Sequence, residues 1–325
     1  MSHSHRTSRK STRRFSHRLT TSVSRSPMTR GRLQALMDQG FGQGRNENYK
    51  AWIPITRGLS SPKSNLFVAK VPICDRGINL LSADEYKTTL VAGWLGAAEI
   101  RDQFPLWPET FVHPMAGLWP GRDCRLPRPP GLIEIARDAG IDHGTYVGGD
   151  VPFVATTDLV VRVGEPPNDR LVFWSCKPLE LMVRGKGATR VLERLELERR
   201  YAGAINAEHR VINAGDFEPN LIGNLDWLTP RKSELNRAQS DVRFDEFVGA
   251  FIASDDGRAL KECIARAGRV ARLDAERTQE YFRISAWLGR IDLDLTVDLV
   301  MSRRPVRDHS RVRTQMRRSL LGDSK

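Results

Sequence analysis

The sequence predicts an α/β sandwich followed by a small helical module, and three observations support this prediction. Two runs rich in Val, Phe and Trp within residues 153–180 flank Glu165–Asp169, whose two prolines exclude it from a strand, so the pair predicts a β-hairpin. An amphipathic helix pattern follows at Thr189–Tyr201. Three further segments with helical periodicity then occupy residues 232–301.

Length and composition set the limits of this prediction. A chain of 325 residues with 40% hydrophobic content can form two compact domains plus tails. The net charge of +12 and the pI near 9.9 indicate a polyanionic partner, most often nucleic acid, although some soluble proteins are basic without one.

The cysteines and the hydropathy exclude several classes. The four cysteines lie far apart without a CxxC pair, which excludes the common zinc patterns and gives no disulfide framework. No run approaches the ~20 apolar residues of a membrane span, and no secretory signal is present. We therefore expect a protein of a reducing compartment with no membrane association.

Both ends of the chain are basic. Residues 1–32 contain nine Arg and Lys and no acid, so we expect a disordered arm over residues 1–46 that lies along phosphates. An organelle transit peptide is a weaker alternative, because Arg32–Gln39 lacks a long amphipathic pattern. Gly40–Gly44 reads as a flexible joint, and the seven arginines between Arg303 and Arg318 predict a second basic tail over residues 303–325.

The elements of the first domain, residues 47–230, are expected in the following order. Besides the hairpin, strands are expected at Trp52–Ile55, Asn65–Val71, Ile100–Leu106 and His209–Asn213, with a turn at Ser60–Lys63. Besides the helix at Thr189–Tyr201, helices are expected at Ser82–Leu95 and Gly131–Ala139.

Glu85 has two competing interpretations. Ser82 precedes it by three residues, which is the capping-box pattern at the start of a helix. A carboxylate folded back onto Ser82 would be drawn away from a catalytic site, so capping and catalysis compete for this side chain.

The predicted hairpin brings an acid and a lysine together. Asp158 lies on its first strand and Lys177 at the end of its second, and neighbouring strands lie about 5 Å apart. In a very basic protein this pair indicates a metal-dependent nuclease core. The plainer alternatives are a strand-end turn former for Asp158 and a surface lysine for Lys177. His143, in the loop before the hairpin, is expected to make an ordinary hydrogen bond and not to bind metal.

The second domain, residues 231–302, has a different composition. Helices are expected at Asp245–Ala253, Gly257–Ala267 and Ala275–Leu288, and Ile291–Leu295 alternates like a strand. Three helices and a strand are typical of a winged-helix-like module, which binds DNA in some proteins and only protein in others. Asp292 and Asp294 alternate away from the apolar residues, so we expect them to be exposed and not catalytic.

Several spaced motifs resemble those of one family. They are YKAW at 49–52, LLSADEY at 80–86, IRDQFPL at 100–106, TTDLVV at 156–161, CKP at 176–178, RLELERRY at 194–201 and LDWL at 225–228. Their order resembles TnsA, the endonuclease subunit of heteromeric bacterial transposases. The resemblance covers residues 40–230 strongly and residues 231–300 more weakly.

This resemblance implies a fold, an activity and partners. The first domain should have a restriction-endonuclease-like fold, a central mixed sheet flanked by helices, and the second a winged-helix-like fold. The expected activity is Mg²⁺-dependent cleavage of DNA at the 5′ ends of the transposon, with Mn²⁺ as a substitute ion. The expected partners are transposon-end DNA, a DDE-type transposase subunit (TnsB-like) that cuts the 3′ ends, and an AAA+ regulator (TnsC-like).

By position, Glu85, Asp158 and Lys177 match the family's catalytic acid, acid and lysine, and the two acids are its metal ligands. The residue two before the lysine is usually Gln or an acid, whereas this chain has Ser175. A hydroxyl is a weaker ligand for a metal ion. Either the Cys176 carbonyl and waters complete the coordination, or metal affinity is reduced.

Two other functions are consistent with the same residues. Ser175 could mark a decayed site in a factor that only bridges transposase and regulator. The chain could also be a stand-alone restriction-type endonuclease, which would need no partner.

Overall fold

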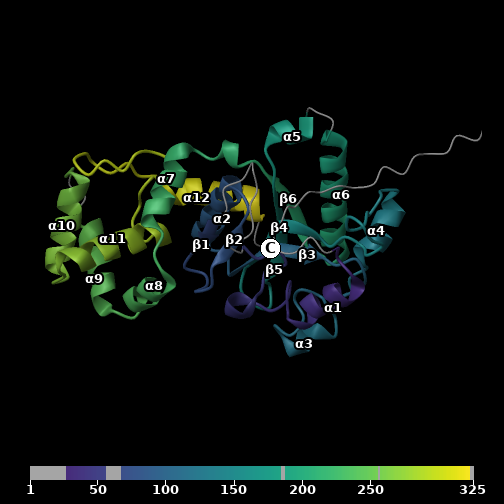
Figure 1. The fold of residues 1–325 in the computed structure, drawn as a ribbon. Coiled ribbons are helices and arrows are strands. Elements are labelled where there is room, and N and C mark those ends of the chain that lie inside the picture. Colours follow the sequence, from purple (N-terminus) through teal and green to yellow (C-terminus); the bar gives the residue numbers. More distant parts are fainter. Residues whose placement is uncertain (1–26, 56–66, 184–186, 255–256, 323–325) are drawn as a thin grey trace, which may run out of the picture.

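A four-stranded mixed sheet forms the centre of the molecule (Figure 1). The computed structural model describes residues 27–55, 67–183, 187–254 and 257–322. The sheet contains β3 (Glu99–Leu106), β4 (Ala155–Val163), β5 (Arg170–Cys176) and β6 (Glu208–Ile212), in that order. The first two pairs are antiparallel and β5–β6 is parallel. The predicted hairpin and the strands at Ile100–Leu106 and His209–Asn213 are thereby confirmed.

Helices cover both faces of this sheet. On one face, Val161 and Val172 pack with α2 (Ala83–Trp94), whose bounds match the predicted helix. On the other, Val160 and Phe173 pack with α4 (Leu132–Ala139) and α6 (Ala188–Ala204). The two faces alternate along β4 and β5 because successive strand side chains point to opposite sides. The result is a restriction-endonuclease-like core, as expected.

The segment before the core is more ordered than its composition predicts. Residues 1–26, most of the expected disordered arm, lie outside the described residues. Residues 30–38 form helix α1 (Arg30–Asp38), which Thr29 caps by accepting from Arg32 N at 3.2 Å. Leu33, Leu36 and Met37 pack against a cluster of Trp52, Trp107 and Val154. The prediction of disorder was wrong here because it was based on the arginines alone, whereas these apolar side chains bury enough surface to order the helix.

Trp52–Ile55 does not form the strand that its composition predicts. Instead, Trp52 packs edge-on against Trp107, with ring centroids 5.3 Å apart. The expected strand at Asn65–Val71 is present in part, as β1 (Phe67–Ala69), which pairs with β2 (Ile78–Leu80). The expected turn at Ser60–Lys63 lies outside the described residues. The remaining short elements are η1 (Asn46–Asn48), α3 (Pro120–Asp123), α5 (Leu179–Val183) and η2 (Ala214–Asp216).

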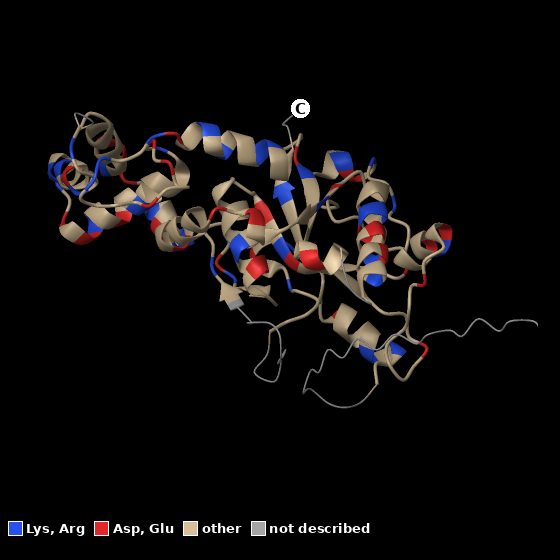
Figure 2. Ribbon diagram, turned by 90° about the horizontal axis from the view of Figure 1, so that it is seen from above, with Lys and Arg blue, Asp and Glu red and all other residues tan. Residues whose placement is uncertain are grey.

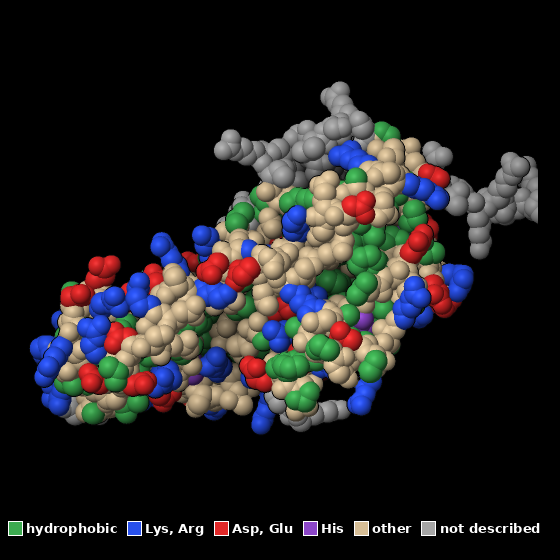
Figure 3. Space-filling view, turned by 90° about the horizontal axis from the view of Figure 1, so that it is seen from below, with side chains coloured by type: hydrophobic (Ala, Val, Ile, Leu, Met, Phe, Trp, Pro, Cys, Tyr) green, Lys and Arg blue, Asp and Glu red, His purple; other side chains and the backbone are tan. Residues whose placement is uncertain are grey.

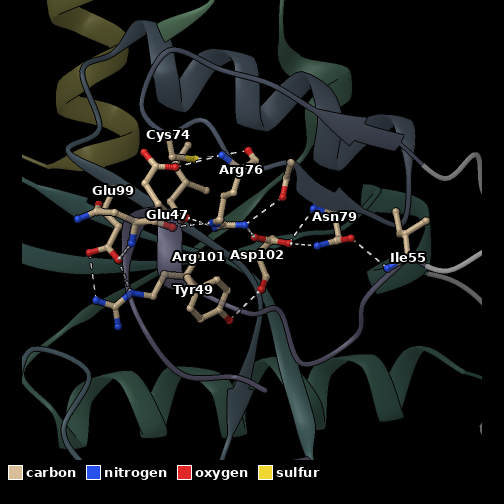
Figure 4. A network of polar contacts seen from close by, with 12 residues as sticks. Glu47, Tyr49, Ile55, Cys74, Arg76, Asn79, Glu99, Arg101 and Asp102 are labelled. Carbon is tan, nitrogen blue, oxygen red and sulfur yellow. Dashed lines mark hydrogen bonds and ion pairs between the residues drawn. The ribbon is translucent and has the colours of Figure 1, made fainter. Parts of the chain in front are cut away.

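A buried polar network fixes β3 to the segments around it (Figure 4). All eight residues of β3 are buried, charged ones included. Asp102 accepts from Arg76 Nη1 at 2.6 Å and from the Asn79 backbone at 2.7 Å. Glu99 pairs with Arg101 on the same strand at 2.9 Å. Because each buried charge has a partner, the strand can carry them without an uncompensated desolvation cost.

The C-terminal part is helical, and its three predicted helices are confirmed, one with the expected bounds Ala275–Leu288 and two with shifted ends. It contains α7 (Pro219–Leu228), α8 (Lys232–Gln239), α9 (Val242–Ile252), α10 (Leu260–Val270) and α11 (Ala275–Leu288). One buried hydrophobic cluster runs from the core into these helices and includes Leu228, Phe247 and Trp287. The domain boundaries stay predictions.

Ile291–Leu295 is not a strand. Ile291, Leu293 and Leu295 are fully buried as the alternation predicts, but they pack into the helical cluster with no neighbouring strand to pair with. Asp292 is exposed and Asp294 half-buried. Since the described residues contain no strand after β6, the winged-helix assignment stays a prediction.

The expected C-terminal tail contains a helix, α12 (His309–Leu321). Its ends, His309 and Leu321, are buried, and Val312 and Met316 pack on the main cluster. The prediction of a tail was wrong because these apolar residues repeat at helical spacing between the arginines. None of the helices in the described part of the chain is long and apolar enough to cross a bilayer.

Candidate active site

The β4–β5 hairpin brings Asp158 and Lys177 into direct contact, as predicted. Lys177 Nζ lies 2.6 Å from Asp158 Oδ2, and the same oxygen accepts from Cys176 N at 2.7 Å. The pairing of Leu159 with Trp174 sets this register. Both side chains are mostly buried, with 13% of the Asp158 and 25% of the Lys177 side chain exposed.

The surroundings of Lys177 keep it charged. Burial opposes the ammonium form, but the Asp158 carboxylate and then Glu198 outweigh this and raise the pKa of Lys177 above its ordinary value. A lysine in this state holds its proton throughout the neutral range. It can stabilise negative charge but cannot act as a base.

Glu85 caps its helix and lies at the same site, so its two competing interpretations are compatible. Its amide donates to Ser82 Oγ at 3.2 Å, and its carboxylate accepts from the Ser82 hydroxyl and from Leu81 N at 2.9 Å. The carboxylate is nevertheless close enough to Asp158 for the two charges to interact. Capping therefore leaves the Glu85 carboxylate within electrostatic range of Asp158.

Glu85 resists ionisation in this environment. Burial, helped by the nearby Asp158 charge, raises the pKa of Glu85 to about 8, against an ordinary value of 4.5. Two nearby carboxylates with limited solvent favour a proton or a cation, because each charge raises the cost of the other. A raised pKa of this kind is a common property of catalytic and metal-binding sites.

Gln103 is a site residue that the sequence reasoning missed. It lies between two β3 residues paired with β4, which places it opposite Asp158, and its Nε2 donates to Glu85 Oε2 at 3.0 Å. Its φ of 46° is in the left-handed region, where a residue other than glycine is strained. The motif IRDQFPL contains this residue, so the motif was the available signal.

The Ser175 hydroxyl hydrogen bonds to side chains other than Asp158 and Lys177. This hydroxyl is fully buried, hydrogen bonds to the Glu198 carboxylate of α6, and lies 2.8 Å from His209 Nε2 of β6. Burial opposes the charged form of Glu198, but the His209 and Ser175 contacts and the Lys177 charge hold the pKa of Glu198 below its ordinary value. The chain thus supplies a carboxylate from α6 beside the position where the family pattern has Gln or an acid on the strand.

The donor set around Asp158 suits a hard divalent cation. Among the described residues no cluster of three or more His, Cys, Asp and Glu side chains could hold a metal ion. Mg²⁺ needs no such cluster, because it binds one or two carboxylates and keeps several waters. Glu85, Asp158 and the Cys176 carbonyl, which lies 3.2 Å from Lys177 Nζ, offer oxygen ligands of the right kind.

Other candidate residues are not part of this cluster. His143 Nδ1 lies 2.9 Å from the carbonyl oxygen of the next residue, Gly144, which is the ordinary hydrogen bond that was expected. All four cysteines are free thiols, and Cys176 contributes only backbone atoms while burial raises its thiol pKa.

Fold and site together define a protein with a restriction-endonuclease-like core that carries two carboxylates and a lysine at one end of its sheet. No family model matches the chain. The chain is 28% identical over 197 residues to the transposition protein TnsA of transposon Tn7 from Escherichia coli. The match covers 60% of this chain and 61% of the length of that protein. The chain is therefore TnsA-like.

Proposed function

We propose that this chain is the DNA endonuclease subunit of a heteromeric transposase, hydrolysing the strand at the 5′ ends of the transposon with Mg²⁺. The observation that carries the proposal is the cluster of Glu85, Asp158 and Lys177, gathered from α2, β4 and the end of β5. The relative's role in the transposition of Tn7 supports the choice of substrate.

Glu85, Asp158 and the Cys176 carbonyl would hold the metal ion. When bound, Mg²⁺ supplies Lewis-acid activation of water and neutralises charge that develops on the phosphoryl group. The fit of the site rests on its donor set, because carboxylate and carbonyl oxygens are the ligands that Mg²⁺ prefers, and Glu85, Asp158 and Cys176 supply them here. Mn²⁺, with similar oxygen preference, is expected to substitute.

Lys177 provides a fixed positive charge for the transition state. Its contact with Asp158 at 2.6 Å positions the ammonium, and its raised pKa keeps it protonated. A preorganised cation in a partly dry site stabilises the negative charge that builds on phosphorus. We assign Lys177 this electrostatic role and not that of a general base.

Gln103 and Glu198 are positioning residues in this proposal. Gln103 holds one oxygen of Glu85, which aims the carboxylate across the β3–β4 pair. Glu198 lies behind Ser175, and its negative charge contributes to the raised pKa of Lys177. Partners that orient catalytic groups in this way commonly contribute about 10–100-fold to affinity or activity.

The proposed partners follow from the same family. They are a DDE-type transposase (TnsB-like) that processes the 3′ ends, an AAA+ regulator (TnsC-like), and transposon-end DNA, all in the bacterial cytoplasm. Requirement for the partner transposase separates this proposal from a stand-alone nuclease.

The site assignment is tested by Asp158→Ala beside Asp150→Ala, a control that removes the same charge from an exposed loop position. Cutting of transposon-end DNA should be lost only in Asp158→Ala, while DNA affinity is kept or increased, because a charge that repels phosphate is gone. Loss of cutting and binding together in Asp158→Ala would count against a metal-holding role.

A further inference from the structure

The C-terminal helix α12 is fixed in place by one of its faces. His309 and Leu321 are buried at its two ends, and Val312, Met316 and Leu320 pack between them on the main hydrophobic cluster. Trp174 Nε1 of β5 also donates to Leu320 O at 3.2 Å. The helix is therefore a rigid part of the fold.

Two of its arginines serve this anchoring. Arg313 Nη2 donates to Trp94 O at 2.6 Å and Nη1 to Leu288 O at 2.9 Å, and Arg317 donates to Leu95 O. These carbonyls end α2 and α11, where unpaired acceptors and the negative end of the helix dipole favour a cation. Arg313 and Arg317 are thus committed to structure, which leaves the opposite face to be explained.

That face is polar and free of acids. Its six exposed residues are Ser310, Arg311, Thr314, Gln315, Arg318 and Ser319, which line one shallow hollow on the surface. Their spacing places them in one stripe along the helix. Figure 2 shows α12 along one edge of the molecule with basic residues over its length. We call this stripe the outer face of α12.

The charge around the outer face is strongly one-sided. Residues 303–322 contain seven arginines and one acid, Asp308, which pairs with Arg311. By contrast, basic and acidic side chains intermix over the helical end of the molecule seen from below (Figure 3). On α6, likewise, Arg199 and Arg200 share Glu196 at 2.8 and 2.7 Å. The outer face therefore fits a polyanion better than those mixed surfaces do.

We propose that the outer face of α12 binds the sugar–phosphate backbone of duplex DNA at a place separate from the cleavage site. Guanidinium, hydroxyl and amide side chains are the groups that usually contact DNA phosphates. Because the helix is already anchored, little ordering entropy opposes the contact. The inference rests on the proposed action on DNA, to which it adds a second contact.

The two DNA contacts lie at different parts of the sheet. Arg170 at the start of β5 donates to Leu321 O of α12, whereas Lys177 follows the other end of that strand. A contact at the outer face adds affinity and sets the path of the duplex, but it takes no part in cleavage.

The test compares two double variants that lose the same charge. Arg311→Ala with Arg318→Ala alters the outer face, and Arg199→Ala with Arg200→Ala is the matched control on α6. Both are made in the full chain with Asp158→Ala to prevent cutting. Affinity for a long random-sequence duplex is measured by fluorescence anisotropy over a salt series without divalent ions.

The outer-face variant should lose about two units of the salt slope, roughly 0.9 for each phosphate contact. Over a fourfold rise in salt, its affinity should then fall roughly 12-fold less than that of the parent protein. The α6 control should keep the parent slope, and replacement of Arg311 and Arg318 by Lys should restore it, because the charge returns. Thermal unfolding checks that the variants are folded.

Equal slopes in the outer-face variant and the parent would overturn the inference, and so would an equal loss in the α6 control. Normal DNA affinity in the outer-face variant, together with loss of transposition when the same two changes are made in the otherwise unaltered chain, would point to a protein partner at α12, which also overturns it. The proposed function fails differently, by an absence of end cutting in the unaltered protein while the salt slopes still differ.

Discussion

The stability of the metal-free protein should fall as the pH rises above 7, because Glu85 must release a proton inside the fold. Burial and Asp158 raise the pKa of Glu85 from 4.5 to about 8. Between these values the folded state keeps a proton that the unfolded chain has released. The stabilisation is complete below the unfolded pKa and is lost as the pH rises through about 8.

The magnitude follows from the two pKa values. One proton difference corresponds to ~1.4 kcal/mol per pH unit, and with half-ionisation near 8 the free energy of unfolding should drop by about 1 kcal/mol between pH 7 and pH 8. This window avoids the buried histidines His113, His143 and His309, whose pKa values burial lowers. Their contribution to the stability of the fold increases with pH only up to about 6.5, the pKa of histidine in the unfolded chain.

Urea unfolding at both pH values measures this difference in three proteins. Glu85→Gln, which mimics the protonated acid, should show no such drop, and Glu246→Gln on the exposed side of α9 should behave like the unaltered protein. Saturating Mg²⁺ should abolish the drop in the unaltered protein, because the cation replaces the proton. Parallel pH dependence of the unaltered protein and Glu85→Gln would refute the raised pKa of Glu85.

Three further predictions concern the residues that support the site. Glu198→Gln should lower cutting about 10–100-fold, because Lys177 loses a neighbouring negative charge; cutting at the unaltered rate would contradict this role. Asp102→Asn should destabilise the fold by about 3–5 kcal/mol in urea unfolding, because the guanidinium of Arg76 stays buried without its partner; a change below about 1 kcal/mol would show that this pair is not needed. Arg313→Ala should lower the free energy of unfolding by about 3 kcal/mol, because the C-terminal carbonyls of two helices lose a charged donor. The control Arg311→Ala, at an exposed position, should change it by no more than about 0.5 kcal/mol. Equal effects of the two variants would argue against the anchoring of α12.

The sequence predicted the core well because local patterns determine it. The prolines of Glu165–Asp169 and the flanking apolar runs specify the hairpin, and hairpin geometry alone brings Asp158 to Lys177. The Ser82–Glu85 spacing specified the start of α2. In each case neighbouring residues in the chain set the conformation, so no knowledge of distant contacts was needed.

The sequence did not predict the features that depend on contacts between segments far apart in the chain. Glu198 reaches Ser175 from a different element, so no local pattern in the sequence identifies this contact. Gln103 matters because of a strained backbone and its place opposite Asp158, neither of which periodicity reveals. The arginines of α12 suggested a tail, although two of them cap helices more than 20 residues away. Each of these contacts depends on tertiary packing, which overrides local composition.

We propose that Glu85, Asp158 and Lys177 form the cutting site of a transposase subunit. The most direct test is strand-specific nicking of labelled transposon-end DNA with Mg²⁺, with and without the partner transposase, and with Asp158→Ala alongside. We expect cleavage at the 5′ ends that needs the partner and is lost in the variant. Cutting without the partner would indicate a stand-alone nuclease. No cutting, with binding to both protein partners intact, would contradict the proposed role of this site and indicate a decayed bridging factor.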